Sequence, residues 1–223
     1  MNPKALQEVL DLVSKGNNLG EKIYLVGATK TISAQVINNA VELGLEIVAE
    51  NKVQEFREKT DLIVGAKQHF IGHLQTNKVK YLVGKVELIQ SVDSFHLAEE
   101  ISKVALKKNI TQDVLVEINV GGELSKSGYS LENAVTGVKE ISKLPGVNVV
   151  GLMAMLPRSN DEALLKRLCL KMRELYDTMI LEGYPFKYLS MGMSHDYKIA
   201  INCGSNMIRL GSKIFGERIY GGI

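Results

Sequence analysis

The sequence predicts an α/β fold, a single-domain TIM (β/α)8 barrel with an extra N-terminal helix, over residues 1–223. The chain has 223 residues, a length at which barrels commonly remain one domain. Eight short runs rich in valine and isoleucine alternate with longer amphipathic runs. That alternation is typical of strands buried on both faces of a parallel sheet and of the helices that cover it. A doubly wound open sheet is the competing fold, because periodicity does not show whether a sheet closes.

The predicted elements follow the chain in order. A leading helix over 3–15 comes first, because polar and apolar residues alternate there at helical spacing. Strands are predicted at 23–26, 46–48, 69–71, 87–89, 114–118, 147–150, 188–190 and 207–210. Helices are predicted at 33–43, 51–64, 94–107, 131–143 and 161–182. Ser33 is expected to cap the first of these helices and Gly44 to end it.

Composition excludes several classes of function. The chain carries 27 basic and 25 acidic residues for a net charge of +2, which gives no clustered basic face for nucleic acid. Cys169 and Cys203 are far apart in sequence without a CxxC motif, so neither a disulfide framework nor a zinc site is predicted. The N-terminus lacks the apolar core of a secretory signal. The longest apolar run, 147–157, is about half a membrane span. A cytoplasmic location without membrane contact is therefore expected.

The loop after the first predicted strand holds the first candidate functional residue. Functional side chains of a barrel lie on the loops that follow its strands, and here that loop is Gly27-Ala28-Thr29-Lys30-Thr31. A solvated charge at a strand end is the commoner fate of a lysine. The alternative is a nucleophile whose pKa is lowered by desolvation and neighbouring cations. Lys30 alone does not decide between them.

The C-terminal segment points to a phosphate site. Glycine and hydroxyl residues cluster at 190–196, 204–206 and 209–212, around the seventh and eighth strands. Ordinary turn chemistry would explain one such loop. Two in adjacent barrel positions, with hydroxyls in both, favour phosphate, which TIM barrels usually bind after strands seven and eight.

Other features give weaker signals. Residues 121–128 could pass for a phosphate loop, but they lack the GxxxxGK[ST] spacing, and we interpret them as a loop or lid after the fifth strand. His69 and His73 are expected on a strand and its loop, so they share no helical face and predict no metal site. His195 has no evident serine or carboxylate partner in sequence. Asn51 is either a helix cap or a residue at the barrel mouth.

Eight motifs follow one another along almost the whole chain, at 28–31, 50–55, 69–78, 125–128, 151–155, 189–194, 204–211 and 215–218. In this order and spacing the chain resembles the pyridoxal phosphate homeostasis proteins, whose barrel is similar to the N-terminal domain of alanine racemase. The resemblance implies pyridoxal 5′-phosphate as cofactor, held as an imine on Lys30. It assigns cofactor binding to Lys30, Asn51, Ser194, Ser205, Asn206, Arg209 and Gly211.

Within that set, the resemblance gives particular roles. Ser194, Ser205 and the backbone around Arg209 to Gly211 are expected to hold the phosphate, with Arg209 at the pyridine nitrogen. Asn206 stands where the family usually has threonine, and its amide N–H is expected to replace the hydroxyl. Ala49 stands where the family usually has glycine.

The resulting hypothesis is a monomeric protein of vitamin B6 homeostasis that buffers pyridoxal phosphate or delivers it to apo-enzymes that depend on it. It is not expected to be an enzyme, beyond a slow racemase-like side reaction. Racemisation would need a second acid/base opposite Lys30, which in alanine racemase is a tyrosine of the partner's additional β domain, and 223 residues are expected to leave no room for that domain. The rival is a racemase-like enzyme with the same cofactor. A third class is a TIM-barrel enzyme acting on a sugar phosphate.

Overall fold

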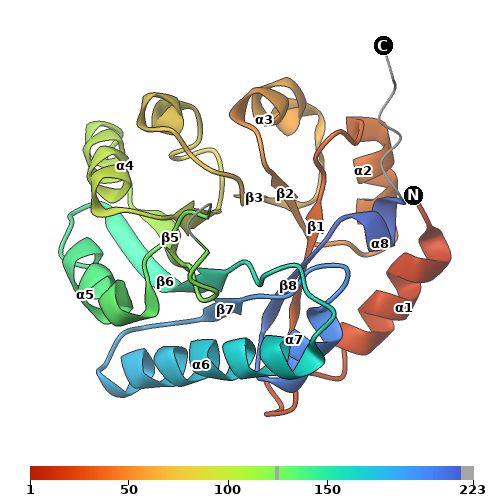
Figure 1. Cartoon of the computed structure of the whole chain (residues 1–223). Coiled ribbons are helices and arrows are strands. Elements are labelled where there is room, and N and C mark those ends of the chain that lie inside the picture. The colour runs from red at the N-terminus through yellow and green to blue at the C-terminus, as the bar shows by residue number, and fades with distance from the viewer. Residues whose placement is uncertain (124–125, 217–223) are drawn as a thin grey trace.

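A computed structural model describes residues 1–123 and 126–216. Its eight parallel strands are paired in sequence order and close into a barrel, β1 to β8, and the helices surround the strands (Figure 1). The closed ring confirms the TIM barrel and excludes the open sheet. Parts of three sequence features, 121–128, 125–128 and 215–218, lie outside the described residues, which end at Gly216 and omit Leu124 and Ser125.

All eight strands occur where the valine and isoleucine runs predict them. They are β1 (Tyr24–Ala28), β2 (Ile47–Glu50), β3 (Lys67–Phe70), β4 (Leu88–Val92), β5 (Gln112–Ile118), β6 (Val147–Ala154), β7 (Tyr188–Ser190) and β8 (Met207–Leu210). The barrel closes where β8 pairs with β1, with Leu210 opposite Gly27.

The long helices also match the prediction. They are α1 (Pro3–Val13), α2 (Ala34–Glu42), α3 (Val53–Lys59), α4 (Phe95–Lys107), α5 (Leu131–Ile141) and α6 (Glu162–Leu181). Ser33 occupies the N-cap position of α2, but its side chain makes no capping hydrogen bond. The predicted helix over 51–64 is shorter, because α3 tightens into the 3-10 helix η1 (Thr60–Leu62).

Three short helices were not predicted. The position after β3 holds only the 3-10 helix η2 (Thr76–Tyr81), and two brief helices flank β8, α7 (Tyr197–Asn202) and α8 (Ser212–Phe215). Elements of four to six residues are too short to show a helical period.

The core has an inner and an outer part. Inside the barrel, apolar residues from the strands form one cluster, and the outer faces of the strands form two further clusters with the helices. The inner cluster includes Val26, Ile47, Ala49, Leu115, Val150 and Met207. Buried polar side chains share the interior with them, among them His69, Gln90, Glu117, Ser190 and Arg209. Polar groups in such a core are costly unless they are paired, so each of them needs a hydrogen-bond partner.

Candidate functional site

Three strand ends meet around Lys30. A Cβ atom added to Gly211, just after β8, would lie 3.3 Å from the carbonyl oxygen of Ala28 at the end of β1. On the other side, the Thr29 N–H donates to the carbonyl of Ala49 in β2, at 2.9 Å. Half-buried Lys30 therefore lies at the carboxyl-terminal rim, with the end of β8 on one side and the end of β2 on the other. This is the edge at which TIM barrels carry function.

Ser194 is brought to the same rim by the turn after β7. The N–H of Met193 donates to Asp196 Oδ1 at 2.5 Å, and Gly192 takes a φ of 101°, where its backbone lies against Tyr197. The turn brings the Ser194 hydroxyl to the start of α8, where it accepts from the N–H of Lys213 at 3.4 Å. Ser194 and the segment that follows Gly211 are thus neighbours, as the sequence predicts.

Arg209 extends from β8 into the barrel interior. Its guanidinium donates to the Ser190 carbonyl at 2.9 Å, to the Ser190 hydroxyl at 2.6 Å and to the Ala154 carbonyl at 2.9 Å. Complete burial lowers the pKa of Arg209 to about 10, although the nearby carboxylates of Glu117 and Asp196 oppose that shift. The side chain therefore remains a cation at neutral pH, fixed in a dry environment.

A chain of neutral polar groups continues from Arg209 across the barrel. The Ser190 hydroxyl donates to Gln90 Oε1 at 2.7 Å, and the Gln90 amide lies 3.0 Å from His69 Nδ1. Burial, aided by the charge of Lys67, lowers the pKa of His69 to about 3, so the ring is neutral and its Nδ1 can accept from the amide. The sequence did not predict this series of hydrogen-bonded side chains. Its only signal was a polar residue inside each of three strands.

Glu117 is a second functional candidate that the sequence did not reveal. It lies in β5 with a buried carboxyl group. Burial and the negative charge of Asp93 raise its pKa to about 7, while Arg209 and, to a smaller extent, His73 act in the opposite direction. A carboxyl group that titrates near neutrality beside a buried cation is typical of a functional site.

Asn51 lies at the end of β2, where two rim segments come into close contact. A Cβ atom on Gly72 would lie 1.9 Å from the carbonyl oxygen of Asn51, so only glycine fits there. Asn51 is half-buried and directly follows Glu50, next to the loop that carries Lys30.

Ser205 and Asn206 lie at the opposite end of β8 from Gly211, away from the rim at which the phosphate site is predicted. They precede the strand, whereas Gly211 follows it. The fully buried Ser205 hydroxyl is within 3.1 Å of the carbonyls of Leu189, Met191 and Met207. The Asn206 amide binds the backbone of Lys187 and Leu189. Both side chains are used in joining β7 to β8.

His195 differs from expectation, and the two cysteines are closer together than their sequence separation suggests. His195 Nε2 lies 3.0 Å from Asp196 Oδ2, so the histidine does have a carboxylate neighbour. Cys169 and Cys203 are both free and buried. Although far apart in sequence, their thiols interact, and burial together with Cys203 raises the pKa of Cys169 to about 12. Such a thiol is a poor nucleophile.

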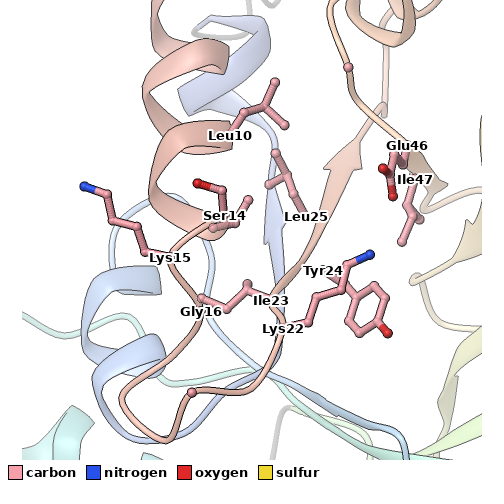
Figure 2. Close-up of a pocket in the computed structure, with 13 residues that line it drawn as sticks. Leu10, Ser14, Lys15, Gly16, Lys22, Ile23, Tyr24, Leu25, Glu46 and Ile47 are labelled. Atoms are coloured by element: carbon pink, nitrogen blue, oxygen red, sulfur yellow. The ribbon is translucent and has the colours of Figure 1, made fainter.

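A cavity of about 460 Å³ lies at the other end of the barrel. Figure 2 shows Leu10 of α1 and Ser14, which follows that helix, along one side of it and Glu46 and Ile47 along the other. These residues line the amino-terminal ends of β1 and β2, away from Lys30. Within the described residues, no group of three His, Cys, Asp or Glu side chains could hold a metal ion. None of the helices in the described part of the chain combines the length and the apolar composition of a membrane span.

Comparison with known proteins identifies the relatives of this barrel. The family described as "Alanine racemase, N-terminal domain" matches residues 24–219. The pyridoxal phosphate homeostasis protein of Aquifex aeolicus is 43% identical over 218 residues, covering 96% of this chain and 94% of that protein.

Several solved structures share the fold, among them the following two. PipY of Synechococcus elongatus with PLP bound aligns with a TM-score of 0.81 and 27% identity, over 95% of this chain and 100% of its own. An alanine racemase of Clostridium difficile aligns with a TM-score of 0.78 over 98% of this chain and 61% of its own, at 16% identity, a likeness that shows the fold alone.

Proposed function

Because the chain belongs to the family of pyridoxal phosphate homeostasis proteins, we propose that it binds pyridoxal 5′-phosphate and buffers or delivers it, with Lys30 as the residue that forms an imine with the cofactor aldehyde. The observation that carries the proposal is the convergence of Lys30, Ser194 and Gly211 on one rim of the barrel, above the buried cation of Arg209. The bound cofactor of PipY, a relative 27% identical to this chain, supports it.

The residues present fit this cofactor in three ways. A lysine amine at the rim suits an aldehyde. The hydroxyl of Ser194 and the backbone N–H groups after Gly211 suit a phosphate, since the start of a helix offers unpaired donors to an anion. The Arg209 guanidinium suits a ring nitrogen that accepts a hydrogen bond. Asn51 completes the proposed set beside Lys30. Ser205 and Asn206 do not belong to it, because their polar groups are bound to backbone at the other end of β8.

Storage suits these residues better than turnover. When bound, pyridoxal phosphate supplies an electron sink for carbanions, and the protein sets how strong that sink is. Arg209, with a pKa of about 10, gives up its proton only reluctantly, so it favours an unprotonated ring nitrogen and a weak sink. We therefore propose that any racemase-like turnover is slow.

The absorbance spectrum tests the cofactor and its attachment. The purified chain with pyridoxal phosphate is expected to absorb at about 420 nm, where the imine of this cofactor absorbs. Borohydride reduction followed by peptide mapping should place the cofactor mass on Lys30, and Lys30→Ala should lose the band. A chain with no such band, or a label on another lysine, would reject the assignment. The sugar-phosphate alternative predicts no chromophore.

Proton exchange separates storage from racemase activity. The holo-protein and Lys30→Ala are incubated with L-alanine in deuterated water, and exchange at the α-carbon is followed by NMR. We expect exchange to be slow in both. Robust exchange that depends on Lys30 would make the chain an enzyme of the racemase class.

We further propose that the protein acts as a cytoplasmic monomer that supplies apo-enzymes dependent on this cofactor. Two unpaired, buried thiols are typical of a reducing compartment. Sedimentation velocity of the purified protein tests whether it is a monomer in solution. Activation of a pyridoxal phosphate-dependent apo-enzyme, mixed with the holo-protein across a dialysis membrane or in direct contact, shows whether delivery requires contact.

A further inference from the structure

The loop that carries Lys30 is a strained turn. The N–H of Ile32 donates to the Thr29 carbonyl at 2.9 Å, which closes a turn with Lys30 and Thr31 at its two central positions. Thr31 has a φ of 67°, in the left-handed region. A β-branched residue is an outlier there, and turns that require a positive φ at this position prefer glycine. Such strain persists only when surrounding contacts hold it.

A cluster of three charged residues supplies those contacts. Lys59, at the end of α3, donates to Glu50 Oε1 at 2.8 Å and to Glu55 Oε2 at 3.1 Å. The side chains of Lys59, Glu50 and Glu55 are 13%, 3% and 18% exposed, so the ion pairs are shielded from solvent. A shielded cluster holds its geometry better than a surface pair, which is screened and mobile.

Each member of the cluster contacts the Lys30 turn. Glu55 Oε2 accepts from the strained Thr31 N–H at 2.7 Å. Glu50 Oε1 accepts from the Thr29 hydroxyl at 2.7 Å, and Lys59 Nζ donates to the Thr29 carbonyl at 3.2 Å. The residues on both sides of Lys30 are therefore fixed by the same three side chains.

The charge state of Glu55 agrees with this arrangement. Burial alone would raise its pKa, but the hydrogen bond from Thr31 and the charge of Lys59 outweigh burial and lower it. The second oxygen of Glu50, Oε2, is buried and has no partner among the described residues. Glu50 therefore depends on Lys59 and Thr29, and the loss of Lys59 would leave a buried carboxyl group poorly compensated.

We propose that Lys59, acting through Glu50 and Glu55, is a positioning residue that holds the Thr29–Thr31 turn in its strained conformation and thereby fixes Lys30 for reaction with the cofactor. The inference rests on the proposed function, because it assigns a role in forming the Lys30 imine. It concerns residues outside the set that would contact the cofactor.

The experiment compares pyridoxal phosphate affinity and imine absorbance in Lys59→Met and Glu55→Ala with the wild-type chain. Each variant is expected to bind on the order of 10-fold more weakly, because the turn is no longer held in a sparsely populated conformation. Lys139→Met is the matched control, since it removes a lysine of an exposed ion pair with Glu182, between α5 and the end of α6. It should bind like wild type. Melting temperatures of the cofactor-free proteins show whether each variant is folded, and Glu55→Ala keeps the test valid if Lys59→Met does not fold.

Rescue separates positioning from a general loss of stability. Glycine adopts a positive φ at no steric cost, so adding Thr31→Gly to Glu55→Ala or Lys59→Met should restore most of the affinity. Unchanged affinity in both single variants, or no rescue by Thr31→Gly, overturns the inference while the proposed function stands. A wild-type chain that forms no imine would overturn both.

Discussion

The pH dependence of stability should be governed in part by Glu117, and replacing it with glutamine isolates that effect. In the folded chain its pKa is raised from 4.5 to about 7, through burial first and the charge of Asp93 second. The folded state therefore binds this proton more tightly than the unfolded chain does. Glu117 favours folding below pH 4.5, and this contribution is lost as pH rises toward 7. A glutamine in its place has no proton to lose.

The size of the effect follows from the two pKa values. The difference between 4.5 and about 7, at about 1.4 kcal/mol for each pH unit, corresponds to roughly 3.5 kcal/mol. Most of it falls between pH 5 and 8, so the stability of Glu117→Gln relative to wild type should increase by roughly 2–3 kcal/mol over that interval. For a domain of this size, that is a relative gain of roughly 5–10 °C in melting temperature.

Thermal and urea denaturation of the cofactor-free proteins at several pH values measure this difference. Replacement of the exposed Glu174 by glutamine is the control and should follow wild type at every pH. Asp93→Asn should move the pH-dependent loss to lower pH, because the charge of Asp93 helps to raise the Glu117 pKa. A stability difference between Glu117→Gln and wild type that stays constant from pH 5 to 8 would refute the reasoning.

Three other predictions test the remaining features of the barrel. Ser205→Ala should lower the unfolding free energy by ~1–2 kcal/mol in urea denaturation without changing cofactor affinity, because its hydroxyl binds only backbone carbonyls. Ser194→Ala should weaken cofactor binding and leave the unfolding free energy unchanged. An equal loss of cofactor affinity in both variants would return Ser205 to the proposed site. Gly72→Ala should cost ~1–3 kcal/mol or prevent folding, since its methyl group would overlap the Asn51 carbonyl; wild-type stability would contradict that contact. At pH 8, alkylation of Cys169 should be ~1,000-fold slower in the native than in the unfolded chain, given a pKa of about 12 against 9.0, and rapid native labelling detected by mass spectrometry would disprove its burial.

The barrel could be predicted from the sequence because its strands are buried on both faces and read as short apolar runs. Burial on both faces is also the reason why the polar residues of the barrel interior could not be predicted. Where both faces of a strand are buried, alternation does not show which side chains face inward, so Gln90 and Glu117 gave no pattern. Only closure of the barrel brings Gln90 of β4 across the interior to Ser190 of β7, one hundred residues away in sequence.

The structure places only part of the residues predicted for the phosphate site at one rim of the barrel, and the reason is the direction of the strands. A glycine and serine cluster looks the same before and after a strand, so 204–206 resembled 209–212. In a parallel barrel only the carboxyl ends of strands form the functional rim. Ser205 precedes β8 and Gly211 follows it, which separates the two clusters by the length of the strand. Lys30 and Ser194 follow their strands, and the structure brings both to that rim.

The charges inside the barrel suit the role proposed for Arg209 in storing the cofactor. Arg209 is surrounded by groups that accept hydrogen bonds without adding charge: the Ser190 hydroxyl, two carbonyls and, further along, Gln90 and a His69 held neutral by burial. A charged His69 would repel the Arg209 guanidinium, and a carboxylate at that position would form an ion pair with the guanidinium. Neutral hydrogen-bonding groups orient the guanidinium and leave its charge uncompensated. Glu117 is a carboxyl near it whose charge changes close to neutral pH. The positive field at the proposed ring position therefore depends on the proton of Glu117. If Arg209 faces the ring nitrogen as proposed, a cation that keeps its own proton would leave that nitrogen unprotonated and the cofactor weakly activated.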